Sequence, residues 1–170
     1  ISKARRLVGY WAARGWLTRL KRGLYNTVPL GTATPHNRKE DPWILASTLF
    51  SPCYVGGWSA CEHWELTDQI FRDIVIFSTK RVRNSRNTVQ DNVFLVKAIS
   101  DWRFFGTEVV WKQQTKVLVS DPSHTIVDIL DDPALGAGMK HTAEVVRQYF
   151  EGDSRNDEKL CEYMALVKNK

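Results

Sequence analysis

Glycines and a carboxylate in the middle of the chain have the spacing of a site for phosphate and metal. Gly56, Gly57 and Ser59 precede an expected helix, and Asp73 opens a β-branched apolar run. Backbone amides of a glycine-rich turn can hold phosphate oxygens, and a carboxylate on the next strand can hold a metal ion, as nucleotidyl transfer requires. Two-metal chemistry needs a second carboxylate, and Val75 stands where it is expected. The pattern therefore indicates at most a degenerate relative of such an enzyme.

A metal site could also be drawn from the acidic residues near His124. Asp128 lies one helical turn after His124, and Asp131 and Asp132 follow. These side chains are metal ligands, but aspartates also cap helices and bond to turns. Asp132 precedes a proline turn, and Asp128 is expected to bond to Thr125 or to the following glycine loop. We therefore expect no metal ion here.

Ser59, His63 and Asp68 have the residue types of a hydrolase triad. Such a triad needs a sharp turn that exposes the serine and a backbone oxyanion hole, and neither context surrounds Ser59. The sequence therefore predicts no catalytic residue and no cofactor, and we expect a protein that is not an enzyme.

Positive charge is concentrated near the N-terminal end. Nine lysines and arginines precede the first acidic residue, Glu40. Residues 120–170, in contrast, carry six basic and ten acidic side chains. Each cation that neutralises a phosphate releases condensed counterions, so the N-terminal segment suits a polyanion and the C-terminal segment does not.

The basic segment has the pattern of a helix followed by a β-hairpin. Apolar side chains recur at spacings of three and four residues up to Trp11, and Gly15 is placed to end the helix. Residues 16–20 and 24–28 then predict two strands about a Lys21-Arg22-Gly23 turn. This is the outline of the recognition helix and wing of a winged-helix domain. A winged helix has a three-helix core, so we expect its first two helices to lie upstream of Ile1.

Basic and polar side chains of this helix and hairpin are the expected DNA contacts. On the helix they could reach base edges or phosphates, whereas on the hairpin they would add affinity more than sequence choice. The expected contacts are Ser2, Lys3, Arg5, Arg6, Tyr10, Arg19, Lys21 and Arg22. A possible second basic patch, in an expected loop between strands, consists of Lys80, Arg81, Arg83 and Arg86.

The rest of the chain predicts an α+β domain with a mainly antiparallel sheet and C-terminal helices. Residues 1–30 form the winged-helix remnant, residues 31–40 a linker and residues 41–170 the C-terminal domain. Helices are expected from Asp41 and Pro42 onward and over 58–66, with strands over 73–78, 92–99, 107–112 and 116–119 and no helix between them. Further helices are expected over 120–130, 139–150 and about 160–167, the last with Ser154 and Asp157 as its cap pair.

Composition sets the remaining limits. A chain of 170 residues that is 43% hydrophobic can form one sizeable core and a small additional module. It contains no apolar stretch of roughly 18 to 20 residues and no signal-peptide pattern. Three cysteines without close-paired spacing favour a reducing cytoplasm. Of the tryptophans, Trp11, Trp16, Trp43 and Trp64 are expected in cores, and Trp58 and Trp102 at the surface; His141 is expected to face solvent.

Three runs, taken together and in this order, resemble the AbiEi family of antitoxins from bacterial abortive-infection toxin–antitoxin systems, which act in phage defence. The most specific part lies between Ser120 and Gly138, where a D-P-x-x-T motif and two apolar residues lead to an aspartate and a glycine-rich turn. The runs are GWLTRLKRGLYNTVPL, DPWILASTLFSPCYVGGWSACEHWELTDQ and VSDPSHTIVDILDDPALGAGMKHTAEVVRQYF.

The resemblance implies a two-domain transcriptional repressor and antitoxin. An N-terminal winged helix would bind inverted repeats in the promoter of its own operon, and the C-terminal domain would supply the antitoxin activity. The toxin would be nucleotidyltransferase-like and opposed without a stable complex. Two alternatives remain open: a winged-helix regulator whose C-terminal domain senses a ligand or dimerises, and a degenerate nucleotidyltransferase relative.

Overall fold

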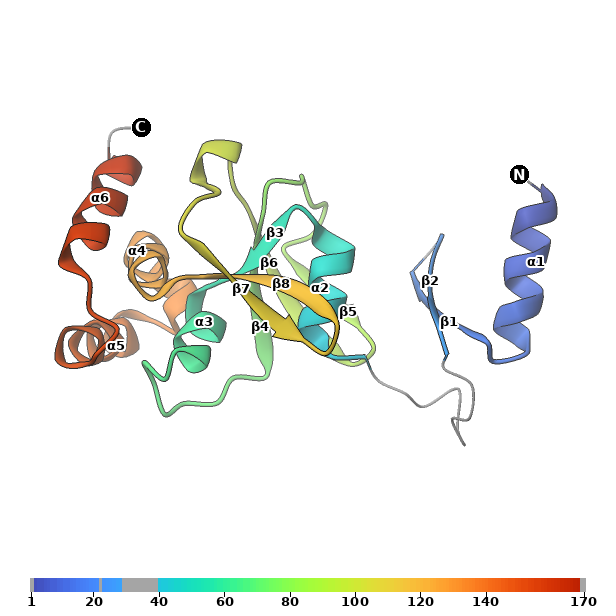
Figure 1. Cartoon of the computed structure of the whole chain (residues 1–170), viewed down its shortest axis with the longest axis horizontal. Coiled ribbons are helices and arrows are strands. Elements are labelled where there is room, and N and C mark those ends of the chain that lie inside the picture. The colour runs from blue at the N-terminus through green and yellow to red at the C-terminus, as the bar shows by residue number, and fades with distance from the viewer. Residues whose placement is uncertain (1, 22, 29–39, 169–170) are drawn as a thin grey trace. The chain divides into compact units, whose positions relative to one another are not determined.

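The computed structural model describes residues 2–21, 23–28 and 40–168, and the chain separates into two compact units, Ile1–Glu40 and Asp41–Lys170 (Figure 1). In the first unit, α1 (Ser2–Ala13) is followed by β1 (Leu17–Lys21) and β2 (Leu24–Thr27), which form an antiparallel hairpin. The predicted helix and hairpin are therefore confirmed, with strand ends shifted by one residue. Most of the expected linker, residues 31–39, lies outside the described residues.

Gly15 ends α1 as the sequence predicted. Its φ of 75° lies in the left-handed region that favours glycine. The Gly15 amide donates to the Ala12 carbonyl at 3.0 Å, and the Trp16 amide donates to the Trp11 carbonyl at 3.0 Å, which is a Schellman ending. This turn directs the chain from the helix into the hairpin.

The apolar stripe of α1 is only partly covered within its own unit. Leu7 is 48% exposed, and Val8 and Trp11 are half-buried. In the described part of this unit the hairpin is accompanied by one helix, so the structure does not establish a winged helix.

The second unit is α+β, as predicted. Its helices are α2 (Pro42–Phe50), α3 (Gly57–His63), α4 (Pro122–Asp131), α5 (Met139–Glu151) and α6 (Asp157–Lys168), with short 3₁₀ turns η2 (Asp101–Arg103) and η3 (Pro133–Gly136). Its strands are β3 (Cys53–Val55), β4 (Asp73–Ser78), β5 (Arg86–Val89), β6 (Asn92–Ala98), β7 (Thr107–Lys112) and β8 (Thr115–Ser120).

The described sheet has the strand order β5-β6-β4-β3-β8-β7. Three neighbouring pairs are antiparallel, whereas β3 with β8 and β4 with β6 are parallel, so the sheet is mixed with an antiparallel majority. The sequence missed β3 and β5. No α-helix lies between the four predicted strands, as expected, and only the 3₁₀ turn η2 interrupts them; the predicted helix over 58–66 is α3, which separates the missed β3 from β4.

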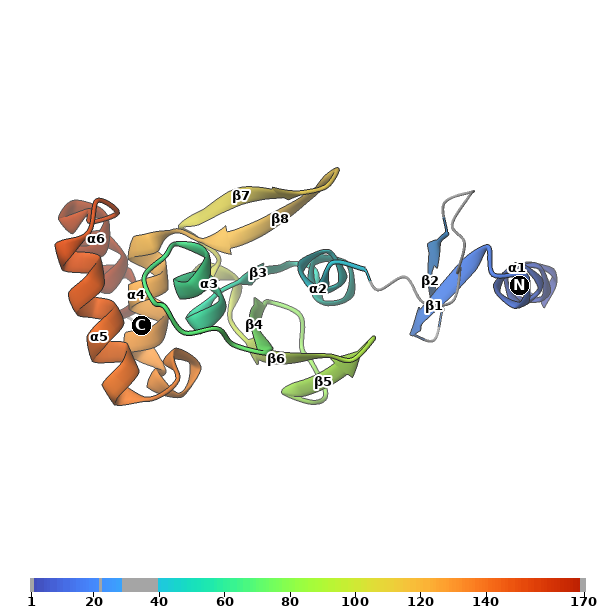
Figure 2. The same ribbon diagram turned by 90° about the horizontal axis from the view of Figure 1, so that it is seen from below.

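The sheet is covered on both faces, with α2 on one side and α3 to α6 on the other (Figure 2). β4 accordingly buries every residue from Ile74 to Ser78. On the α2 face, Phe50 packs against Phe94 of β6 with ring centroids 5.6 Å apart. On the other face, Tyr54 of β3 stacks on Phe77 at 5.0 Å.

Aspartate caps begin two helices where the sequence placed them. Asp41 accepts from the Trp43 amide at 2.8 Å, and Asp121 accepts from the His124 amide at 2.8 Å. The expected cap pair of the last helix was wrong, because the capping residue is Asn156, directly before α6, whose side chain accepts from the Lys159 amide at 2.9 Å. Helices α3 to α6 share one core, composed of Cys61, Leu66, Ile126, Val127, Ile129, Val145, Tyr149, Leu160 and Tyr163.

Candidate nucleic-acid interface

The cations of α1 are exposed and have no carboxylate nearby in the sequence. Lys3, Arg5 and Arg6 are all exposed, and residues 1–39 contain no aspartate or glutamate. Among the described residues, no ion pair engages these three side chains. Their charge is therefore directed to solvent, where a polyanion can neutralise it.

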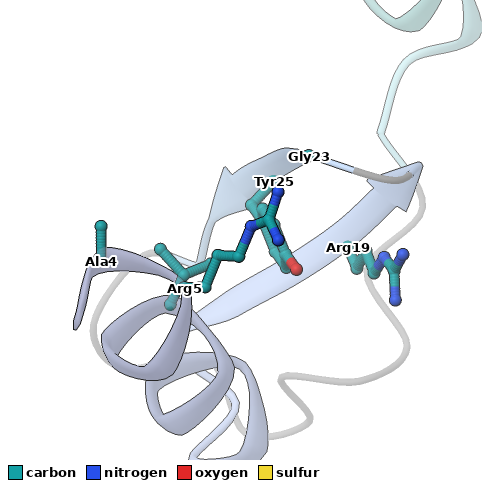
Figure 3. Close-up of a pocket in the computed structure, with 6 residues that line it drawn as sticks. Ala4, Arg5, Arg19, Gly23 and Tyr25 are labelled. Carbon is teal, nitrogen blue, oxygen red and sulfur yellow. The ribbon is translucent and has the colours of Figure 1, made fainter. Parts of the chain in front are cut away.

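Arg5 also lines a groove between α1 and the hairpin. The groove encloses about 440 Å³, and the side chains of Arg5 and Tyr25 approach each other across it (Figure 3). Ala4 and Val8 of α1 complete one wall, and Arg19 of β1 lines the other. The Arg5 guanidinium and the Tyr25 phenol at this open groove are donors of the kind that phosphate oxygens require. The structure thus brings together two of the predicted contacts, Arg5 and Arg19, and adds Tyr25, which sequence reasoning missed.

Tyr10 takes part in an aromatic cluster at the end of α1. Its ring meets the Trp16 ring edge-on with centroids 6.5 Å apart, and the Arg14 guanidinium lies 5.0 Å from the Tyr10 centroid and 5.9 Å from the Trp16 centroid. Tyr10 and Trp16 are 49% and 50% exposed, so the expectation that Trp16 belongs to a core was wrong. Arg14 was missed as a candidate contact, although its spacing of four residues from Tyr10 on one helix face was a visible signal.

For the remaining predicted DNA contacts, the structure describes the backbone of two residues and nothing of the third. Ser2 lies in α1 and Lys21 in β1, and their side chains are outside the description. Arg22 lies outside the described residues. The assignment of the hairpin tip to the DNA backbone therefore stays a prediction.

The second basic patch is divided by the structure. Lys80, Arg81 and Arg83 are exposed before β5, as a loop patch requires. Arg86 is the first residue of β5, not part of the loop, and its guanidinium pairs with the Asp73 carboxylate at 2.9 Å. One of the four cations is thus already engaged within the protein.

Packing accounts for the glycines that resemble a phosphate-binding turn. A Cβ on Gly57 would lie 2.6 Å from the Leu135 carbonyl oxygen, and one on Gly56 would lie 2.6 Å from the Phe77 ring. The Ser59 hydroxyl accepts from the Val75 amide at 3.0 Å. The turn is therefore pressed against β4 and η3, and its small residues fit that close approach.

The acidic residues near His124 form a buried contact and an ion-pair cluster. Burial raises the pKa of Asp128 to about 8 and lowers the pKa of His124 to about 4, so both are uncharged at neutral pH. The Tyr54 hydroxyl donates to Asp128 at 3.2 Å, which differs from both expected partners, Thr125 and the following glycine loop. The flanking Asp131 and Asp132 instead pair with cations, Arg103 at 2.9 Å and Lys97 at 3.0 Å respectively.

Neither of the other chemical hypotheses gains an assembled site. Within the described residues, no group of three or more His, Cys, Asp or Glu side chains could hold a metal ion. No hydrogen bond joins Ser59, His63 and Asp68 there. His141 is buried, not solvent-facing as expected. Comparison of the chain with protein-family models and with curated proteins finds no match.

Proposed function

We propose that this chain is a DNA-binding antitoxin and autoregulator of the AbiEi kind. In this proposal it binds inverted repeats in the promoter of its own operon and counteracts a nucleotidyltransferase-like toxin. The observation that supports DNA binding is the exposed cationic α1 beside a basic hairpin in a segment without carboxylates. The antitoxin part is supported by the three sequence runs that resemble the family.

The proposal divides the work between the two units. The first unit holds DNA, and the second supplies the antitoxin activity without catalysis, cofactor or a stable complex with the toxin. The proposed setting is the cytoplasm. None of the helices in the described part of the chain has the length and apolar content that crossing a bilayer requires.

Binding of labelled duplexes by the full chain tests the DNA part. We expect a promoter duplex to bind more tightly than a scrambled duplex of equal length and composition. Affinity for both should fall steeply between two salt concentrations, because each neutralised phosphate contributes a slope of about 0.9 in log affinity against log salt. Equal affinity for the two duplexes would remove the repressor assignment, and affinity independent of salt would remove the phosphate contacts.

Co-expression with the neighbouring toxin gene tests the antitoxin part. The full chain and a chain lacking residues 1–30 should both rescue growth, because the proposal places neutralisation in residues 41–170. Rescue by neither would contradict the antitoxin assignment, and rescue by the full chain alone would move the activity to the first unit. The comparison does not depend on promoter binding, so the two parts of the proposal can fail separately.

The degenerate nucleotidyltransferase alternative has its own test. Asp73 is paired with Arg86, and Val75 takes the place of a second carboxylate, so we expect no nucleotide transfer with magnesium. Turnover that Asp73→Ala abolishes would overturn the non-enzymatic proposal.

A further inference from the structure

The two edge strands of the described sheet differ in how well they are protected against pairing with a strand of another molecule. β5 and β7 lie at opposite edges (Figure 2). β5 has four residues, whereas β7 has six and pairs with β8 through six consecutive positions without a bulge. Proteins normally protect an edge strand by shortness, proline or a bulge, because its outer N–H and C=O groups can recruit another strand. β7 has none of these three protections, and β8 is its one strand partner in the described part of the chain.

β7 also exposes apolar side chains on one face. Val109 and Trp111 alternate onto that face and are 49% and 59% exposed. The Lys116 ammonium of β8 lies 5.2 Å from the centroid of the Trp111 ring, which nevertheless stays largely exposed. A regular edge with an apolar flank favours association with another strand.

The opposite face of β7 carries two opposite charges at matched positions. Glu108 is exposed and lies two residues before Val110, and Lys112 lies two residues after it. The Lys112 ammonium lies 4.7 Å from the centroid of the Trp43 ring, at the side of β7. On this face of β7 the valine Val110 therefore has an acidic side chain on one side and a basic side chain on the other.

We propose that β7 pairs antiparallel with β7 of a second copy of this chain, with the twofold axis at Val110. In this register Glu108 of each copy lies opposite Lys112 of the other, and Val109 lies opposite Trp111. The two copies thus share two ion pairs on one face and two apolar pairs on the other. Centring the axis on Val109 or Trp111 instead leaves both charges without an oppositely charged partner.

A second copy of this chain is the proposed partner of β7 because the strand edge is complementary to itself. An isologous contact requires that one patch complement itself, which the acid–base symmetry about Val110 provides. Six residues of edge pairing make a contact below the roughly 1,000 Å² typical of stable interfaces, so self-association is weak and concentration-dependent. The contact uses the second unit alone and does not depend on DNA binding.

Charge exchange in the full chain, without DNA, tests the pairing. We expect the sedimentation coefficient of the wild type to rise with concentration. Glu108→Lys and Lys112→Glu should each weaken self-association about tenfold or more, because each places like charges opposite one another twice. An equimolar mixture of the two variants restores the ion pairs and should associate again. A wild type that stays monomeric at all concentrations, or a dimer insensitive to both variants, overturns the proposal.

Cysteine cross-linking tests the register. Cys161 is exposed, so the background is Cys161→Ser; Cys53 and Cys61 are buried. In that background Val110→Cys should form an intermolecular disulfide under oxidation, because directly opposite residues lie within disulfide reach. Val109→Cys on the same strand is the control and should not cross-link, because its copies lie two positions apart. Equal cross-linking at both positions, or none at Val110, overturns the register, and this readout does not need Lys112→Glu to fold.

Discussion

The two units use the same cationic residues in opposite ways. Arginines and lysines of α1 are exposed in a segment with no carboxylate before Glu40. In the second unit, cations meet carboxylates: Arg103 with Asp131, Lys97 with Asp132, Arg86 with Asp73, Arg147 with Glu151 and Arg155 with Asp157. Lysines and arginines of the first unit thus leave their charge available to a partner, whereas these cations of the second unit are neutralised by carboxylates of the same unit.

This difference separates the residues that are available for binding from those that stabilise the fold. The second unit buries polar groups deeply, as with Asp128, Tyr54 and His124, whereas the described side chains of α1 are at most half-buried. Changes in the first unit should therefore alter binding more than folding, and changes in the second unit should do the reverse.

The largest expected effect is on folding of the second unit. Tyr149 is fully buried on α5, its hydroxyl donates to the Asn156 carbonyl at 3.1 Å, and it accepts from the Asn156 amide at 2.8 Å. We expect Tyr149→Ala to lower the free energy of unfolding by about 3 to 5 kcal/mol, measured by urea denaturation. The adjacent Phe150 is 42% exposed, so Phe150→Ala is the control and should cost far less. Weaker DNA binding by folded Tyr149→Ala would show that the two units are not independent.

On the other side of the comparison, Arg6→Ala should weaken promoter binding by about 1 to 3 kcal/mol without changing the free energy of unfolding. Arg147→Ala is the control, because Arg147 is also an exposed helical arginine but pairs with Glu151 at 3.2 Å. Lys21→Ala should weaken binding to promoter and scrambled duplexes alike. Equal losses on both duplexes for Arg6→Ala would contradict its assignment to base contacts.

The buried Asp128 predicts a pH dependence confined to the second unit. Its pKa is raised by burial to about 8 in the folded protein, so between pH 6.5 and 8 the folded state keeps a proton that the unfolded state has released. Unfolding free energy should therefore fall as pH rises through this window, by roughly 2 kcal/mol in total. We expect Asp128→Asn to remove this slope, measured by urea denaturation at a series of pH values.

His124 predicts a second change in the free energy of unfolding, at lower pH, that the same measurement can detect. Its pKa is lowered to about 4, so between pH 6.5 and 4 the unfolded state binds a proton that the folded state does not. Its contribution is fully present above pH 6.5 and is lost as pH falls toward 4, which opposes the Asp128 contribution there. An Asp128→Asn slope equal to the wild-type slope between pH 6.5 and 8 would place the titration on another group.

Strands whose own residues have a clear apolar pattern could be predicted from the sequence. Strands that form only because a distant segment pairs with them could not. The bounds of β4 and β7 match the sequence prediction because their apolar residues alone specify a strand. β5 reads Arg-Asn-Thr-Val and is a strand because β6 pairs with it, and β3 has only three residues. Such short or polar strands leave little signal in a single sequence.

The candidate site shows the same division. The cationic segment follows from composition, but the approach of Arg5 to Tyr25 depends on how the hairpin folds back on α1. Buried polar partners were equally hidden, since Tyr54 and Asp128 are 74 positions apart. His141 was expected at the surface and is instead bonded to Thr67 at 2.8 Å, also 74 positions away.

The second basic patch, where paired and unpaired cations lie close together in the described part of the second unit, should show the smallest effect. Arg86 is exposed but already paired with Asp73, so Arg86→Ala should lower the free energy of unfolding by less than about 1 kcal/mol and leave DNA affinity unchanged. Arg83 is exposed nearby, and Arg83→Ala serves as the matched variant. A loss of affinity for Arg83→Ala alone would add the loop before β5 to the DNA contacts, because Arg83, unlike Arg86, has no carboxylate partner among the described residues. Loss for both variants would mean that DNA competes with Asp73 for Arg86, and the contrast between exposed and neutralised cations would no longer separate the units.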